Sequence, residues 1–414
     1  MPDLDALLEA CRRAPDDDAP RLVWADAVGG ERGELVVIQC DLARGGLLPA
    51  AAAARRRRER ELLTAHGRRW AGLVGLTSIK RRVEFRRGFV EAVELDASTL
   101  ATRGDELFRR APLLRSVTAV GLGAVSGEGE AITHPPLDRL RALIESPVLP
   151  RLSGLHLDGV GRWAPPGADP GFEGVGDEAA WLAGGAGALA HLSGFGISSS
   201  GLTATGLRRL ARPGALGDLE RLWLGEHDLR ALYPPGWTPP DADAVLALLA
   251  RVPRVTSLEL GEVTGIERVL AALPPLTELR LPGLADDALA ALGRSRAAPT
   301  LETLRVSGAL ACERALPELS RLRVLDLGGA SFGLGARDLA AALPALRRLR
   351  LRWRVPEREL RLLAEVLGPR LEELAVTDAS YAPSDPAVLA LARFVAGDVI
   401  VRSADAAPDL DPLL

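Results

Sequence analysis

The chain has 414 residues, of which 47% are hydrophobic and 26% are charged, and its formal net charge of −4 gives no overall attraction to nucleic acid. Its three cysteines, Cys11, Cys40 and Cys312, are far apart and form no Cys-x-x-Cys pair, which argues against structural disulfides and zinc sites. No apolar run approaches the roughly 18 residues that span a bilayer, and the first residues lack the pattern of a signal peptide. We therefore expect a cytoplasmic, monomeric protein that contacts no membrane.

Four helices are predicted in the first 80 residues. The first covers residues 3–13, where Leu4 and Leu7 share a face and Asp3 can act as the N-cap. The second has Pro20 in its first turn and ends at Gly29-Gly30, and the third and fourth cover residues 35–42 and 49–66. Residues 1–80 are therefore expected to form a small all-helical module.

Two motifs in this module are specific. Residues 15–26 read Pro-Asp-Asp-Asp-Ala-Pro-Arg-Leu-Val-Trp-Ala-Asp, and residues 32–39 read Arg-Gly-Glu-Leu-Val-Val-Ile-Gln. Over about the first 70 residues the chain thus resembles the bacterial repeat-companion domain, a helical module that precedes leucine-rich-type repeats in planctomycetes and myxobacteria. It departs from that family after Asp26, where Ala27-Val-Gly-Gly-Glu-Arg32 replaces the usual Trp-Leu and acidic residues. The resemblance implies repeats downstream and no catalytic activity, so it assigns no functional residue.

The charged residues of the module have structural interpretations. Arg21 and Asp26 lie on one short helix and are expected to brace the module rather than to bind a ligand. The arginines at 55–58 are a possible nucleic-acid patch, but four consecutive helical residues spread around more than a full turn. A solvated helix is therefore the favoured interpretation of that run.

Alternating apolar residues on both sides of a glycine predict a β-hairpin over residues 83–95. We expect residues 81–95 to cap the N-terminal end of a solenoid that covers residues 81–403, because an uncapped edge strand invites aggregation. Further strand phrases begin at Leu114, Leu152, Leu192 and Leu219, at intervals of 38, 40 and 27 residues, and 36 residues precede the next phrase.

Three insertions account for these long intervals, near residues 121–136, 162–181 and 227–240. Each follows the C-terminal end of a predicted strand, so all three should emerge along one edge of the solenoid, where binding loops are often found. Trp163, Tyr233 and Trp237 are therefore candidate partner-binding residues. The alternative is that such aromatic side chains only fix long loops to the solenoid.

The segment from Val255 to Val376 is the most regular part of the chain. An apolar residue, two variable residues, Leu, one variable residue and Leu or Val recur six times, with starts 21, 25, 21, 24 and 25 residues apart. The Leu-x-Leu alternation predicts a short strand with one buried face, and helical patterns such as 286–292 and 337–343 fill the spacers. Phrase and period resemble leucine-rich repeats. The resemblance implies an α/β fold, a right-handed solenoid with parallel strands on its concave face and helices on its convex face.

Beyond the regular repeats the pattern fades. A helix over residues 386–395 and a last strand at 399–401 are predicted, and residues 404–414 are expected to form a loose tail.

Positions four and six of each phrase should point into the core and position five to the concave face. The candidate partner-binding residues on that face are His156, Trp223, Glu259, Arg280, Arg305, Arg348, Arg350 and Arg352. Exposed Trp and Arg are enriched in interface hot spots, and Arg suits carboxylates and phosphates. Neighbouring carboxylates, such as Glu278 and Asp326, leave open that cross-strand ion pairs neutralise the arginines.

No set of residues in the sequence converges on a reaction. The five histidines occur singly, and no zinc, serine-hydrolase or phosphate-loop motif is present. We expect no catalytic residue, metal or cofactor, and the leading hypothesis is a scaffold that binds a protein through its concave face and edge insertions. Two alternatives remain: anion or nucleic-acid binding through the C-terminal arginines, which the net charge disfavours, and an adaptor or sensor in bacterial signalling or defence.

Overall fold

Thirteen strands form one sheet in the described part of the chain, and they follow one another in sequence order from β1 to β13. The computed structural model describes residues 3–73, 75–76, 82–120, 122, 136–158, 175–185, 187, 189–198, 201–225, 237–312, 319–332, 336–352, 357–377, 391 and 393–402. The first two strands pair antiparallel, and each later described strand pairs parallel with its neighbour. The expected α/β class and the mostly parallel sheet are therefore confirmed.

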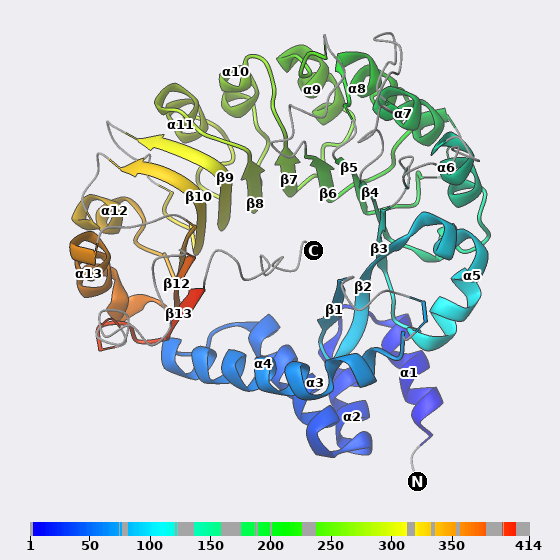
Figure 1. Ribbon diagram of the computed structural model, residues 1–414, viewed down its shortest axis with the longest axis horizontal. Coiled ribbons are helices and arrows are strands. Elements are labelled where there is room, and N and C mark those ends of the chain that lie inside the picture. Colours follow the sequence, from blue (N-terminus) through cyan, green and yellow to red (C-terminus); the bar gives the residue numbers. More distant parts are fainter. Residues whose placement is uncertain are drawn as a thin grey trace, which may run out of the picture.

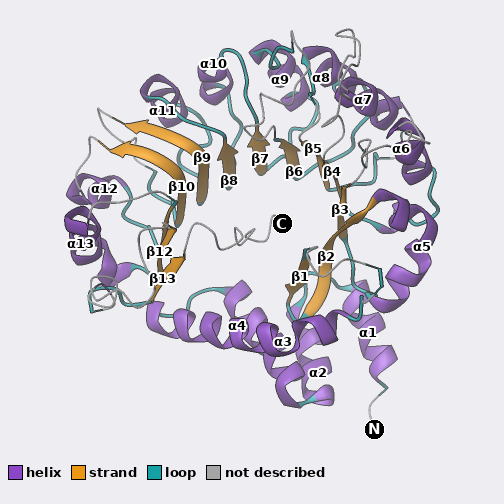
Figure 2. Cartoon of the chain, viewed as in Figure 1, coloured by secondary structure: helices purple, strands orange, loops and turns teal. Residues whose placement is uncertain are grey.

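Figures 1 and 2 show that this sheet bends into a nearly closed ring, with strands on the inner side and helices on the outer side. The strands are β1 (Val83–Arg86), β2 (Phe89–Asp96), β3 (Ser116–Val120), β4 (Gly154–Asp158), β5 (Gly194–Ser198), β6 (Arg221–Leu224), β7 (Ser257–Leu260), β8 (Glu278–Leu281), β9 (Thr303–Cys312), β10 (Val324–Phe332), β11 (Arg348–Leu351), β12 (Glu373–Thr377) and β13 (Asp398–Arg402). The outer helices are α5 (Ala97–Arg110), α6 (Pro136–Ile144), α7 (Val175–Gly185), α8 (Ala204–Leu210), α9 (Ala242–Leu249), α10 (Ile266–Ala271), α11 (Asp286–Gly293), α12 (Ala336–Ala342) and α13 (Glu357–Leu367), with short 3-10 turns at Leu149–Arg151 and Gly368–Arg370.

The leucine positions of the repeat phrase form one continuous core between strands and helices. Leu258, Leu279 and Leu304 stand in register on neighbouring strands, and each is at most 1% exposed. One strand with one helix cannot cover its own apolar face, so each unit depends on its neighbours. The strands predicted from the phrase are all present, and β9 and β10 continue past it to pair at Gly329–Phe332 with Ala309–Cys312.

Four helices precede the sheet: α1 (Leu4–Arg13), α2 (Asp18–Val28), α3 (Gly30–Arg44) and α4 (Pro49–Ala71). Asp3 caps α1 as predicted, and Asp17 caps α2, which therefore starts two residues before Pro20. The third and fourth helices are longer than the sequence indicated. In Figure 1, α4 lies across the gap between β13 and β1.

The predicted hairpin is present, and its turn fixes the module against the first strands. Arg87 and Gly88 both have positive φ, 45° and 83°, as a two-residue turn between twisted strands requires. The Gly88 N–H donates to Gln39 Oε1 at 2.6 Å, and a Cβ at Gly88 would lie 2.2 Å from Val36 Cγ2. Gln39 Nε2 donates to the carbonyl of Phe85 at 3.1 Å, so α3 satisfies a backbone group of the edge strand.

Apolar contacts and one buried ion pair join the module to the hairpin. Trp24 packs edge-on against Phe89, with ring centroids 4.7 Å apart. Arg21 is fully buried and its Nη2 lies 2.5 Å from Glu91 Oε1 on β2. Arg21 therefore has the expected bracing role, but its partner is Glu91 rather than Asp26, which is exposed.

Candidate functional site

The fifth position of every phrase forms a row along the inner face of the ring. Strand pairing aligns these residues one with the next from β2 to β12, in the order that the sequence pattern predicted. The row is Glu94, Thr118, His156, Gly196, Trp223, Glu259, Arg280, Arg305, Asp326, Arg350 and Ala375. The sheet thus holds polar side chains at fixed spacing, about 4.8 Å from strand to strand.

Trp223 is not the exposed aromatic that the alternation predicted, because it is only 3% exposed. Its ring stacks on His156, with centroids 5.9 Å apart and planes 29° from parallel. Neighbouring Gly194 and Gly196 leave room for the indole: a Cβ at either glycine would lie within 3.4 Å of Trp223 atoms. Arg221 adds a cation–π contact at 5.7 Å. Trp223 is therefore a packed part of the inner wall.

His156 also belongs to a short polar chain. Its Nε2 lies 2.9 Å from Ser198 Oγ, and the Ser198 hydroxyl donates to Asp158 Oδ1 at 2.8 Å. Because the hydroxyl proton goes to the carboxylate, Ser198 Oγ accepts from the imidazole N–H. A nucleophile activated by a base needs the opposite direction, with the hydroxyl donating to the imidazole. These two hydrogen bonds fix the orientation of the His156 ring on the inner face.

Arg350 and Arg352 pair with carboxylates on neighbouring strands. Arg350 Nε donates to Glu373 Oε1 at 2.6 Å, and Arg352 donates to both oxygens of Asp326 at 2.9 and 2.8 Å. The carboxylates are nearly buried, with side chains 5% and 4% exposed, whereas the arginine side chains are 20% and 42% exposed. Burial by itself would raise the pKa of Glu373, but the charge and hydrogen bond of Arg350 outweigh it and lower that pKa. The guanidinium groups therefore lie above the acids that neutralise them.

The arginines nearer the middle of the sheet are paired as well. Arg280 Nε and Nη2 donate to Glu278 Oε1 at 2.9 and 2.8 Å, and Glu259 lies 3.7 Å away. Arg305 Nε lies 3.6 Å from the same Glu278 oxygen. Burial, followed by the nearby charge of Arg280, lowers the pKa of Arg305 to about 10. We call Arg280, Arg305, Arg348, Arg350 and Arg352 the arginine strip. Of the two interpretations left open by the sequence, the structure supports ion pairing within this strip.

Arg348 belongs to the same strip and faces helix α4. Its Nε lies 3.7 Å from Glu372, which also pairs with Arg56 at 2.7 Å. Burial, followed by the positive charge of Arg56, lowers the pKa of Arg348 to about 10. Residues 56 and 348 come from opposite ends of the chain, so this contact belongs to the place where the ring closes.

The arginines of helix α4 close the ring, which no sequence pattern indicated. Arg57 Nη2 and Arg60 Nη2 each lie 2.7 Å from one oxygen of Asp398 on β13. Arg55 and Arg58 point instead to Asp41 and Glu34 within the module, at 2.7 and 2.8 Å. The predicted solvated helix is therefore confirmed only in part: the side chains of Arg55, Arg57 and Arg58 are 40%, 62% and 40% exposed, but each also pairs with a carboxylate. As the helical geometry predicted, however, the run forms no single dense basic face.

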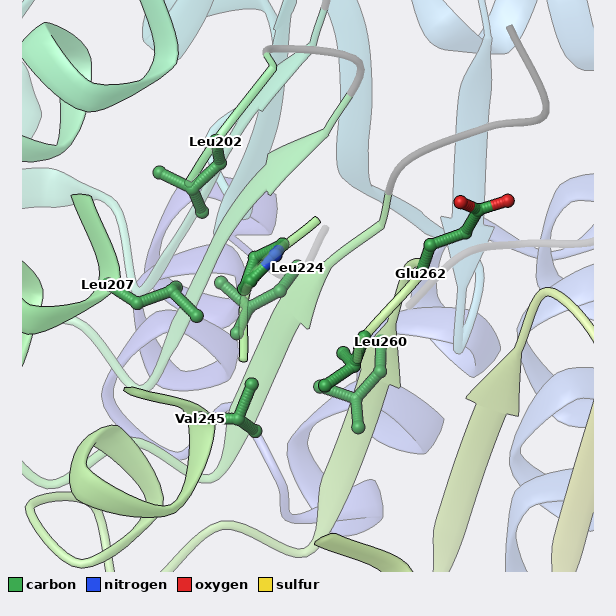
Figure 3. Close-up of a pocket in the computed structure, with 8 residues that line it drawn as sticks. Leu202, Leu207, Leu224, Val245, Leu260 and Glu262 are labelled. Atoms are coloured by element: carbon green, nitrogen blue, oxygen red, sulfur yellow. The ribbon is translucent and has the colours of Figure 1, made fainter. Parts of the chain in front are cut away.

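The edge-insertion candidates are only partly visible. Trp163 and Tyr233 lie outside the described residues, and Trp237 is half-buried where the described chain resumes before α9. The same edge holds a small apolar recess at the ends of β6 and β7, which Figure 3 shows. Its lining consists of Leu202, Leu207, Leu224, Pro240, Val245, Leu260, Glu262 and Val263. The Glu262 carboxylate points away from the leucines in Figure 3, so this side chain does not place its polar group among them.

Within the described residues, no group of three His, Cys, Asp or Glu is placed to hold a metal ion. Across the same ranges, none of the helices is both long and apolar enough to cross a membrane. In comparisons with known proteins, no family model and no curated sequence matches the chain.

Proposed function

We propose that the chain is a non-catalytic leucine-rich-repeat scaffold that binds a protein partner on the inner face of its ring. The observation that carries this proposal is the in-register row of the inner face together with the side chains beside it, where the partly exposed Arg350 and Arg352 lie above the buried carboxylates of Glu373 and Asp326. Each guanidinium has five N–H donors, and Arg352 uses its Nε and Nη2 groups on Asp326 while its side chain stays 42% exposed, so it can also donate to a partner. Rigid, pre-oriented donors suit recognition because little side-chain freedom is lost on binding.

The charge balance of this surface favours a protein over a nucleic acid. Glu278, Asp326 and Glu373 lie among the arginines of β8 to β11, so the strip has no strong excess of positive charge. Binding to a phosphate backbone depends on releasing counterions to a net positive surface. A protein partner that offers carboxylates and carbonyls at matching positions needs no such excess.

The sequence features point the same way. The leucine phrase resembles repeats whose concave faces bind proteins, and the N-terminal module resembles a domain that accompanies such repeats. We assign partner contacts to His156, Glu259, Arg305, Arg348, Arg350 and Arg352, and at the edge to Trp163, Tyr233 and Trp237. Trp223 and Arg280, both under 9% exposed, shape the wall instead of contacting the partner.

Blocking the inner face without breaking an ion pair tests the proposal. Ala375 continues the position-five row beside Arg350, so Ala375→Tyr places a ring over the arginine strip. The matched control is Ala290→Tyr on α11, where Ala290 is exposed on the outer helices. A partner captured from the source cells should be retained by wild type and by the control and lost with Ala375→Tyr, at unchanged melting temperature.

Two outcomes contradict the proposal. A partner that Ala375→Tyr retains as well as wild type does not bind the inner face. Tight binding of single-stranded RNA or polyphosphate that weakens steeply with salt, and that Ala375→Tyr abolishes, assigns the strip to anion binding.

A further inference from the structure

The ring has two junctions between the helical module and the sheet, and they differ in chemistry. On the β1–β2 side, Phe89 joins Trp24 and Val36 in one apolar cluster, and Phe85 packs with Leu35 and Leu62 in another. One hydrogen bond that Gln39 donates, one that it accepts, and the buried Arg21–Glu91 pair add to these contacts. This junction is therefore built like a protein core.

The junction on the β13 side is ionic. Arg57 and Arg60 each donate to one oxygen of Asp398, and Arg56 donates to Glu372, all at 2.7 Å. The Arg57 and Arg60 side chains are 62% and 43% exposed, whereas that of Asp398 is 10% exposed. The Arg56–Glu372 pair is less solvated, with side chains 14% and 16% exposed. Partly solvated ion pairs such as those of Asp398 contribute little to stability and weaken as salt rises, unlike buried apolar contacts.

Like charges sit within the same junction. Arg56 lies close enough to Arg348 for its charge to lower the pKa of Arg348, after the larger effect of burial. Glu372 lies between them, 2.7 Å from Arg56 and 3.7 Å from Arg348. Closure on this side therefore depends on two carboxylates, those of Glu372 and Asp398, which hold four arginines together.

We propose that α4 and β13 form an ionic clasp that closes the ring, and that the inner face admits its protein partner when this clasp opens. When the clasp opens, the last strand separates from the helical module. The β1–β2 junction stays intact and acts as the hinge, because the apolar junction is the stronger of the two. Access matters because the strands of the inner face line the space that the ring encloses (Figure 2). The gating part rests on the proposed function, whereas the clasp itself does not.

Small-angle X-ray scattering tests the clasp without any partner. Asp398→Arg places a fifth arginine in the junction and should increase the radius of gyration and the maximum dimension. Exchanging the charges, with Arg57→Asp and Arg60→Asp added to Asp398→Arg, should restore the wild-type dimensions. Wild type should expand between about 0.1 M and 1 M NaCl, because the screening length falls from about 10 Å to about 3 Å.

Matched neutral variants control for general effects on the module. Arg57→Gln with Arg60→Gln removes the donors to Asp398 and should expand the protein. Arg58→Gln removes an arginine of the same run that pairs with Glu34 inside the module, so it should leave the dimensions unchanged. If Asp398→Arg does not fold, the neutral pair of variants carries the test. The clasp is overturned if the folded Asp398→Arg and Arg57→Gln/Arg60→Gln variants, and wild type at high salt, all keep the wild-type dimensions.

Association kinetics test the gating. With the partner that depends on Ala375, Asp398→Arg should accelerate association by about the inverse of the fraction of open wild-type rings, about tenfold if one ring in ten is open. An expanded Asp398→Arg that associates no faster than wild type refutes gating and leaves the inner-face proposal intact. A partner indifferent to Ala375→Tyr refutes the proposed function, and the scattering result still decides the clasp.

Discussion

The buried ion pair between Arg21 and Glu91 makes a quantitative prediction about how the module is attached. The side chains are 0% and 4% exposed, and Arg21 also donates to the carbonyls of Pro15 and Arg86, at 2.8 and 3.4 Å. Its guanidinium lies 5.5 Å from the Phe89 ring centroid. Both charges are thus removed from water, and each depends on the other.

Removing one partner leaves the other charge buried and uncompensated. Arg21→Met or Glu91→Leu alone should each destabilise the junction by about 3–5 kcal/mol. The double variant removes both charges and leaves mainly the Pro15 and Arg86 carbonyls without their donor, so it should cost only about 1–3 kcal/mol. The two single effects are therefore far from additive, with a coupling of at least about 3 kcal/mol.

Hydrogen exchange of the β2 amides gives this local free energy directly, which suits a repeat structure that need not unfold in one step. The exposed pair Arg268–Asp243, with side chains 64% and 69% exposed, is the control, and Arg268→Met should cost at most about 1 kcal/mol. If the double variant costs the sum of the singles, or if Arg21→Met costs less than about 1 kcal/mol, the reasoning about the buried pair is refuted.

Three further predictions concern the core, the hairpin turn and the cysteines. Leu304→Ala should lower the unfolding free energy by about 2–5 kcal/mol in urea titrations, since Leu304 is 1% exposed within the leucine stack; a loss below about 1 kcal/mol would contradict that packing. Gly88→Ala should cost about 1–3 kcal/mol through its φ of 83° and its approach to Val36, and should speed exchange of the hairpin amides first; equal protection in both proteins would exclude the strain. Burial, followed by the charge and hydrogen bond of Asp18, raises the pKa of Cys40 to about 12. In a Cys312→Ser background, iodoacetamide at pH 8 should therefore alkylate Cys40 about a thousandfold more slowly in the native protein than in the unfolded chain. Comparable alkylation rates in the two states would disprove the raised pKa.

The strands and their register were predictable because local pattern and period determine them together. Leu-x-Leu assigns alternate residues to the core, and a period of 21 to 25 residues returns the chain to the next parallel strand. Shifting a strand by one residue would turn its leucines away from the core, so one register is strongly preferred. For the same reason the position-five row, from Glu94 to Ala375, followed from the sequence without any knowledge of the fold.

The exposure of that row was not predictable from alternation alone. Trp223 is buried because Gly194 and Gly196, on the preceding strand, leave a flat space for its ring. The signal was present in the row, where a glycine stands beside a tryptophan, but it appears only when neighbouring phrases are compared. The arginines were likewise paired, most of them by carboxylates on the neighbouring strand, whereas Arg280 pairs with Glu278 on its own strand.

No local sequence pattern could predict how the ring closes. Arg57 and Asp398 are separated by 341 positions, and a basic helix gives no sign of which distant carboxylate it will meet. The module's attachment raised the same difficulty on a smaller scale, since Arg21 had an acid on its own helix, Asp26, and used Glu91 on β2 instead. Ion pairs have no periodicity, so only the folded arrangement of charges identifies them.

The two junctions together explain why a helical module stands at the start of this sheet. A stack of parallel strands ends in two edges, and each edge has backbone groups that favour pairing with another chain. Helix α3 covers the first edge through Gln39 and the Phe85 carbonyl, and α4 reaches the last strand through Asp398. One module thus contacts both ends of the sheet, firmly at β1 and ionically at β13. An open solenoid needs a separate cap at each end, whereas a ring closed by its own N-terminal helices shares one cap between them, and the weaker contact determines where the ring opens.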